Sequence, residues 1–109
     1  MNFPILIKLV GVSYGDCQDN IKQFGCPDTG FYILLREPEN PHDSNCIAVS
    51  LGGVWHMGFI SRGLAKDLAP MMDAGRVFDA EFVCVNEYPP HERIGLTLKI
   101  IERGEENNE

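Results

Sequence analysis

Three residues of the types that form a Ser-His-Asp triad occur in the chain: Ser13, His42 and Asp43. Acyl transfer would use the hydroxyl as nucleophile, the imidazole as base and the carboxylate to orient that base. His42 and Asp43 are sequence neighbours on one constrained loop, however, which does not favour the geometry that such a relay needs. We therefore predict a protein without catalysis.

The spacing of the metal-ligating residue types gives little support for a metal site. The cysteines Cys17, Cys26, Cys46 and Cys84 are scattered singly, and the three histidines add no ligand spacing. We predict free thiols, as in a reducing compartment, with Cys46 and Cys84 as small buried residues of strand segments. No metal or cofactor is predicted.

A polar loop with two prolines is the most distinctive feature of the chain, in the segment REPENPHDSNCIAV at residues 36–49. Pro38 and Pro41 fix φ and bias the residues before them towards extended backbone. Side chains such as those of Asn40 and Asp43 form hydrogen bonds with nearby backbone amides. The loop is therefore predicted to be rigid, either as a connector between strands or as a place that holds a ligand.

The segments on both sides of this loop have the patterns of short strands. Apolar runs rich in β-branched residues predict six strands, at residues 5–13, 31–36, 46–51, 54–60, 76–87 and 93–102. In the last of these the apolar residues alternate strictly, which is typical of a half-buried strand.

One helix is predicted after Ser61, which is a good N-cap. Its apolar residues form one stripe that faces a core, Leu64, Leu68, Met71 and Met72. Gly75 suits the helix end, and Pro70 should kink the helix or split it. Residues 16–24 predict one further helical turn. The fold class is thus mostly β, a small OB-like or SH3-like six-stranded antiparallel barrel with one or two short helices.

The balance of charge limits what the protein can bind. With 16 acidic and 9 basic residues, the chain has a net charge of −7. Residues 102–109 are predicted to be an acidic, disordered tail after a domain at residues 1–101 that is itself acidic. Such a surface disfavours broad binding to a phosphate backbone, so any contact with nucleic acid must be local. The chain shows no signal peptide and no apolar run of about 20 residues, which predicts a cytoplasmic protein without a membrane span.

The chain resembles the HIRAN domain family over about residues 6–101. The resemblance rests on three segments, VGVSY at residues 10–14, REPENPHDSNCIAV at residues 36–49 and GFISRGLA at residues 58–65. The loop pattern, R-E-P-x-N-P followed by D-x-N and a strand, is the most specific of the three. The other two segments are weak signals that occur at the expected places.

The resemblance implies an OB-like barrel without catalysis. In fork-remodelling helicases of eukaryotes the similar domain binds the 3′-hydroxyl end of single-stranded DNA, as part of DNA repair. Tyr14 then matches an aromatic residue that stacks on the terminal base, and Asp43 matches the acid that accepts a hydrogen bond from the terminal hydroxyl. Arg62 matches a basic residue near the terminal phosphates. A helicase or a nuclease is the partner protein that this resemblance suggests.

Three positions depart from the pattern of the DNA-end binders. Ser13 stands where they have an arginine, His42 where they have a tyrosine and Phe59 where they have a histidine. The missing arginine removes a charged hydrogen bond worth about 1.5–3 kcal/mol, or roughly tenfold to a hundredfold in affinity. We therefore expect weaker DNA binding than in those relatives.

Structural alternatives remain for each of the proposed contact residues. Tyr14 can serve as a lid on the barrel, Asp43 as a brace of its own loop and Arg62 as a solvated surface residue. For the whole domain the alternative is a protein-interaction or regulatory module of the same fold that has lost DNA binding.

Overall fold

The computed structural model describes residues 2–103, and that part of the chain contains six strands and two helices. In chain order they are β1 (Ile5–Lys8), α1 (Cys17–Phe24), β2 (Tyr32–Arg36), β3 (Ile47–Leu51), β4 (Trp55–Phe59), α2 (Arg62–Asp73), β5 (Phe78–Glu87) and β6 (Ile94–Glu102). The predicted fold class is confirmed. Glu102, the first residue of the predicted tail, ends β6, and residues 104–109 lie outside the described part.

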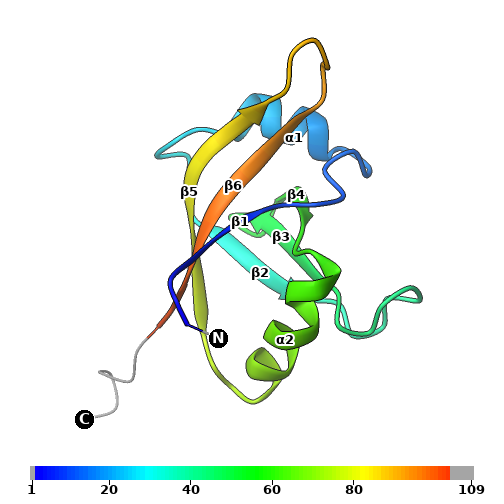
Figure 1. Ribbon diagram of the computed structural model, residues 1–109, viewed down its shortest axis with the longest axis vertical. Coiled ribbons are helices and arrows are strands. Elements are labelled where there is room, and N and C mark those ends of the chain that lie inside the picture. The colour runs from blue at the N-terminus through cyan, green and yellow to red at the C-terminus, as the bar shows by residue number, and fades with distance from the viewer. Residues whose placement is uncertain (1, 104–109) are drawn as a thin grey trace.

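All six strands form one antiparallel sheet in the order β1-β6-β5-β2-β3-β4. The sheet curls until its two edge strands approach one another, and Val10, just after β1, forms a bridge with Phe59 of β4. Their amides and carbonyls exchange hydrogen bonds of 2.9 and 2.8 Å. β2 and β5 share a single register pair, Tyr32 with Ala80, so the sheet opens between them. The result is a small barrel that is only partly closed (Figure 1).

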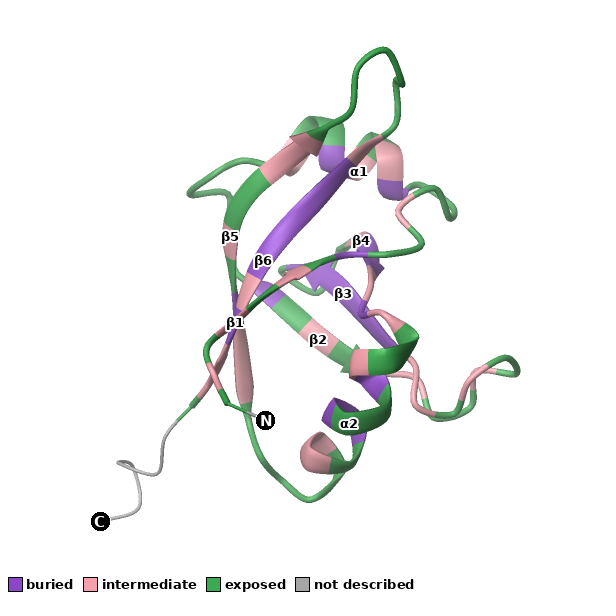
Figure 2. Cartoon of the chain, viewed as in Figure 1, coloured by how far each residue is buried: buried purple, intermediate pink, exposed green. Residues whose placement is uncertain are grey.

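The core fills the inside of the curled sheet. Leu96, Leu98 and Ile100 of β6 are fully buried, at the alternating positions that the sequence predicted. Ile21 of α1 and Leu68 of α2 reach the same cluster, so both helices are fixed to the sheet by apolar contact. Figure 2 shows buried stretches on both helices and along β6 and β3. Burying each of these side chains stabilises the fold by about 1.5–3 kcal/mol.

Helix α2 begins and ends as its sequence predicts. The Ser61 hydroxyl accepts a hydrogen bond from the amide of Leu64, and Gly75 follows the helix with a φ of +97°. The amide of Gly75 donates to the carbonyl of Met72, and the next amide donates to Met71, which is a Schellman motif. The apolar stripe of α2 packs on the core as expected.

Pro70 was predicted either to kink α2 or to split it, and the second of these outcomes is wrong, because Arg62–Asp73 is one helix with Pro70 inside it. A proline inside a helix leaves the carbonyl four residues earlier, here that of Lys66, without its donor. Pro70 and Lys66 are both on the exposed side of α2, where water can supply that hydrogen bond. The buried side of the helix therefore runs on without interruption.

Two other segments near the N-terminus differ from expectation. The first strand ends at Lys8 rather than Ser13, because Gly11 has a φ of +62° and turns the chain. After this turn α1 runs for 8 residues, longer than the single turn predicted, and Ile21 anchors it in the core. No helix within residues 2–103 has the length and apolar character needed to cross a membrane.

Cys84 is exposed, which corrects the prediction that it is buried. The cause is a bulge in β5: Phe82 pairs with Leu98 and Cys84 with Thr97, so Val83 is an extra residue on that strand. An extra residue reverses the alternation of side chains beyond it. Cys46 is only half buried, whereas Cys17, for which no burial was predicted, is fully buried in the structure.

Candidate nucleic-acid interface

Tyr14 lies on a tight turn between β1 and α1. Its amide donates to the carbonyl of Gly11 at 3.0 Å, and a Cβ atom on Gly11 would lie 2.7 Å from the Phe59 ring. Glycine is therefore needed both for the positive φ and for the close approach to Phe59. Gln18 of α1 holds the turn by donating to the carbonyls of Val12 and Ile94, at 2.9 and 2.8 Å.

Tyr14, His56 and Phe59 form a surface group of rings, called here the aromatic cluster. The Tyr14 ring centroid is 5.7 Å from that of Phe59 and 6.1 Å from that of His56, with interplanar angles near 70° in both contacts. His56 and Phe59 are 4.8 Å apart. Tyr14 is still 65% exposed, so its ring is not sealed inside the barrel. Its ring is supported from the side and open to a ligand.

A bulge in β4 brings His56 and Phe59 to the same side of the strand. Gly58 pairs with Val49 and His56 with Ser50, so Met57 is the extra residue. Gly58 has a φ of +154°, and a Cβ atom there would lie 3.0 Å from the carbonyl oxygen of Val10. Strict alternation would have placed residues 56 and 59 on opposite faces. The aromatic cluster therefore depends on this glycine.

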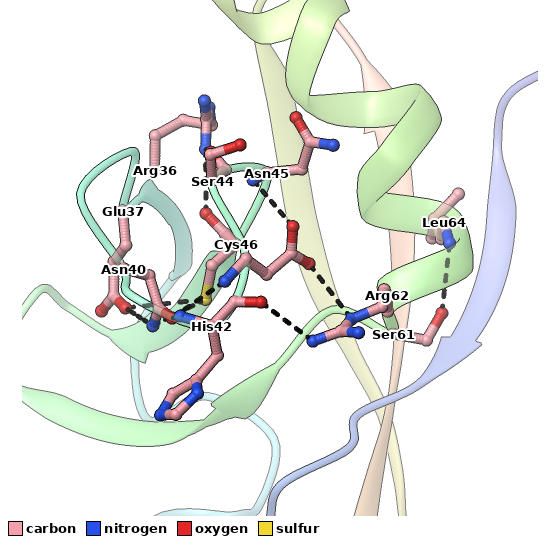
Figure 3. Close-up of polar contacts among 11 residues, drawn as sticks. Arg36, Glu37, Asn40, His42, Ser44, Asn45, Cys46, Ser61, Arg62 and Leu64 are labelled. Carbon is pink, nitrogen blue, oxygen red and sulfur yellow. Dashed lines mark hydrogen bonds and ion pairs between the residues drawn. The ribbon is translucent and has the colours of Figure 1, made fainter.

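The polar loop after β2 is held by Arg36. Its guanidinium donates to both carboxylate oxygens of Asp73, at 2.9 and 3.0 Å. It also donates to the carbonyls of Ser44 and Cys46, at 3.1 and 3.0 Å (Figure 3). The Arg36 hydrogen bond holds the pKa of the Asp73 carboxyl below its ordinary value. One side chain thus joins β2, the loop and the end of α2.

Asn40 organises the tip of the same loop. Its side-chain oxygen accepts from the amides of His42 and Asp43, at 2.8 and 3.3 Å, as in the predicted Asx-type turns. Its amide nitrogen lies within hydrogen-bond distance of Glu37 and of the Cys46 sulfur. Burial, together with the Glu37 carboxylate, raises the pKa of the Cys46 thiol. The loop is therefore built around internal hydrogen bonds.

Asp43 and Arg62 form an ion pair between the loop and the first turn of α2. One Asp43 oxygen, Oδ1, accepts from the amide of Asn45 at 2.9 Å, while Oδ2 lies 3.6 Å from Nε of Arg62. Arg62 also donates to the carbonyl of His42 at 3.1 Å. The Asp43 side chain is 21% exposed and that of Arg62 is 75% exposed. The loop-brace role of Asp43 thus involves Oδ1, whereas no loop amide binds Oδ2 in the described residues.

The predicted contact residues fall into two groups that the end of β4 connects. Tyr14 and Phe59 belong to the aromatic cluster, and His42, Asp43 and Arg62 belong to the loop. Figure 3 shows the His42 imidazole pointing away from the Arg62 guanidinium. Phe59 and Arg62 are three residues apart, which is at most about 10 Å of extended chain. Ser13 is on the same turn as Tyr14, and its hydroxyl accepts a hydrogen bond from Arg93, a residue of neither group, at 2.8 Å.

The turn that carries Tyr14 also has the G-x-S-x-G pattern of a nucleophile elbow, at residues 11–15. In a nucleophile elbow the serine sits in strained backbone, with a base beside its hydroxyl. Asp28 is the one non-glycine residue with positive φ among residues 2–103, so Ser13 is not strained in this way. Its hydroxyl binds the Arg93 guanidinium, which cannot accept a proton.

Two residues at the surface were not predicted from sequence, His56 and Arg93. The sequence indicates no role for His56 because its contact with Phe59 depends on the β4 bulge. The glycine in the segment WHMGF was the available signal, since glycine inside a strand often marks a bulge. Arg93 approaches Ser13 across 80 residues of sequence, a contact that no local pattern indicates. Among the described residues no group of histidine, cysteine and acidic side chains could hold a metal ion.

Comparison with known proteins identifies the family. The fold is similar to the crystal structure of the HIRAN domain of human HLTF, with a TM-score of 0.65 and 22% identity over 96% of this chain and 78% of that one. It is also similar to that of a protein from Lactobacillus plantarum, with a TM-score of 0.64 and 23% identity over 92% of this chain and 95% of that one. No curated protein matches the chain in sequence. The sequence model of the HIRAN domain matches residues 5–101, and the chain therefore belongs to the HIRAN domain family.

Proposed function

We propose that this chain is a non-catalytic module that binds the 3′ end of single-stranded DNA. The HIRAN domain is known as a DNA-binding module, and the sequence matches it over residues 5–101. The observation that carries the proposal is an exposed aromatic ring that the fold supports at a fixed place, that of Tyr14. A site of this kind suits an acidic protein, because stacking needs no positive surface.

Tyr14 would stack on an unpaired base near the end of the strand. Stacking of one base on an aromatic side chain is worth about 1–3 kcal/mol and tolerates any sequence. Phe59 and His56 limit the movement of the Tyr14 ring, so less conformational entropy is lost when a base binds. The expected binding is therefore independent of sequence.

Asp43 and Arg62 would distinguish a free end from a continuing strand. The Oδ2 atom of Asp43 can accept a hydrogen bond from a terminal hydroxyl, and Arg62 can contact the phosphate on the other side of the same sugar. A phosphate in place of that hydroxyl would bring a second negative charge close to the carboxylate. At 4 Å such repulsion costs about 1 kcal/mol in water and about 4 kcal/mol near a protein surface.

The affinity should be lower than in relatives that carry an arginine before the stacking tyrosine. Ser13 provides no charge at that position, and the net charge of −7 opposes the approach of a phosphate backbone. Binding is therefore expected to weaken as rising ionic strength screens the few local attractions.

Fluorescence anisotropy with matched oligonucleotides tests the proposal. One strand ends in a 3′-hydroxyl, the second in a 3′-phosphate, and a third carries its phosphate at the 5′ end as a control for charge. We expect the first and third strands to bind at least about fivefold more tightly than the second, which corresponds to about 1 kcal/mol. Equal affinity for all three strands would contradict end recognition.

A second candidate function is that of a protein-interaction module with the same fold. A groove of about 810 Å³ lies where β2 and β5 separate, and Phe31, Ile33, Leu35 and Val77 are among its exposed apolar side chains. A helicase or a nuclease is the class of partner to test. Capture of such a protein that survives nuclease treatment, and is lost in Leu35→Glu but not in Tyr14→Ala, would favour this function over DNA binding.

A further inference from the structure

A cationic groove lies beside the turn that carries Tyr14. It has a volume of about 330 Å³ and runs between residues 8–13 and residues 86–95. Its lining includes two basic side chains, Lys8 and Arg93, and contains no aspartate or glutamate. In a chain with 16 acidic residues and a net charge of −7, a groove with this lining is a local exception.

Arg93 is held at the wall of this groove from two directions. Its guanidinium donates to the Ser13 hydroxyl at 2.8 Å, and the next residue, Ile94, exchanges hydrogen bonds with the Gln18 side chain at 3.0 and 2.8 Å. Gln18 also holds the carbonyl of Val12, so Arg93 and the turn of Tyr14 are fixed to the same helix residue. The position of the charge relative to the aromatic cluster is therefore set by the fold.

Most of the hydrogen-bonding capacity of Arg93 remains available. A guanidinium has five N–H donors, and Ser13 takes one of them. Within residues 2–103 Arg93 forms no ion pair, in contrast to Arg36, Arg76 and Arg103, each of which binds a carboxylate. Lys8 is exposed at the end of β1 on the same groove and is likewise unpaired in that part of the chain. Two basic residues thus line one groove that has no carboxylate in its lining, an arrangement that attracts an anion.

We propose that this groove binds backbone phosphates of single-stranded DNA upstream of the base on Tyr14. The inference rests on the proposed function and adds the path of the strand: from the 3′ end at Asp43, past Tyr14, and along Lys8 and Arg93. The groove would then supply affinity through charge, whereas Asp43 supplies the preference for a free end.

The salt dependence of binding separates these two contributions. For single-stranded DNA, each phosphate that the protein neutralises adds about 0.7 to the steepness of log affinity against log salt concentration. We expect Arg93→Gln and Lys8→Gln each to flatten the slope by about 0.7 and the double variant by about 1.4. The ratio of affinities for 3′-hydroxyl and 3′-phosphate strands should stay at the wild-type value in all three.

Two further variants serve as controls. Lys22→Gln removes the same charge from α1, outside the groove, and should leave the slope unchanged. Arg93→Lys keeps the charge but loses the planar fork, and should keep the slope within about 0.2 of wild type. If Arg93→Lys flattened the slope as much as Arg93→Gln, Arg93 would be a brace of the turn and the proposal would be overturned.

The remaining outcomes distinguish this inference from the proposed function. If the salt-dependence slope of Arg93→Gln and Lys8→Gln equalled that of wild type, while wild type still preferred 3′-hydroxyl strands, only the proposal that the groove binds phosphates would be overturned. If these variants had a flatter slope but wild type showed no preference for 3′-hydroxyl strands, phosphate binding in the groove would be supported and recognition of the 3′ end contradicted. Absence of DNA binding by the wild-type protein would overturn both.

Discussion

At the scale of single residues, the exposed ring of Tyr14 is the part of the site whose contribution to the free energy of DNA binding is easiest to predict. Tyr14→Ala should weaken binding of single-stranded DNA by about 1–3 kcal/mol, or roughly fivefold to 150-fold, because one base loses its stacking partner. Tyr14→Phe should bind within about threefold of wild type, since it keeps the ring. Anisotropy with one fluorescent strand measures both.

Phe31→Ala provides the matched control for the loss of an exposed ring. Phe31 is 78% exposed and lines the groove between β2 and β5, not the aromatic cluster. DNA affinity should not change in this variant. A decrease as large as that of Tyr14→Ala would show that aromatic surface in general, rather than this site, determines binding.

Asp43→Asn tests the preference for a free 3′ end. The asparagine oxygen can still accept the hydrogen bond from the amide of Asn45, so the loop should keep its conformation. The negative charge is lost, and with it the repulsion of a 3′-phosphate. We expect the affinities for the 3′-hydroxyl and 3′-phosphate strands to approach each other within about twofold. Asp67→Asn, an exposed acid of α2, should retain the wild-type ratio.

At the scale of elements, the sequence predicts what is local and misses what depends on bulges. The succession of strands along the chain, the caps of α2 and the rigid loop follow from short patterns such as Ser61, Gly75 and the prolines of residues 36–41. The extra residues Met57 and Val83 each reverse a strand's alternation, which exposes Cys84 and brings His56 beside Phe59. Bulges arise from pairing between strands, so one strand's pattern only hints at them.

The rigidity of the loop after β2 depends on one charged side chain. The Arg36 side chain is only 16% exposed. Its single guanidinium binds Asp73 and two loop carbonyls, and so connects β2 to the loop and to α2. Arg36→Ala should lower the free energy of unfolding by about 1.5–3 kcal/mol, the worth of a charged hydrogen bond. It should also speed hydrogen exchange at the amides of Asn45 and Cys46.

Arg36→Lys separates the geometry of this contact from its charge. A lysine keeps the positive charge but cannot form the planar fork, so loop amides should exchange faster than in wild type and more slowly than in Arg36→Ala. Urea unfolding and exchange monitored by NMR measure both quantities. Protection of Asn45 and Cys46 that is unchanged in Arg36→Ala would mean that Asn40 and the prolines suffice to hold the loop.

At the scale of the whole molecule, the arrangement of charge explains how an acidic domain can have a site for DNA. Within residues 2–103 four arginines form ion pairs with carboxylates, and three of these pairs lie outside the proposed DNA contacts: Arg36 with Asp73, Arg76 with Glu102 and Arg103 with Asp79. These pairs stabilise the partly closed barrel, in which β2 and β5 share one register pair. The basic residues outside such carboxylate pairs include Lys8 and Arg93, beside Tyr14.

The structural ion pairs give the fold a dependence on acid pH. Hydrogen bonds from Arg36 and Arg76 lower the pKa of Asp73 from 3.8 and that of Glu102 from 4.5. Since these carboxyls bind protons more tightly in the unfolded chain, their contribution is fully present above the unfolded values and is lost as pH falls through the folded ones. The double variant Asp73→Asn, Glu102→Gln should therefore have a lower urea midpoint than wild type at pH 7. The difference should shrink below about pH 4.5 and vanish at lower pH.

The control is the double variant Asp67→Asn, Glu39→Gln, which removes the same amount of charge from residues outside both pairs. Its urea midpoint should follow a pH profile parallel to that of wild type. If the Asp73→Asn, Glu102→Gln variant differed from wild type by the same amount at every pH, these pairs would stabilise the fold by packing and not by charge.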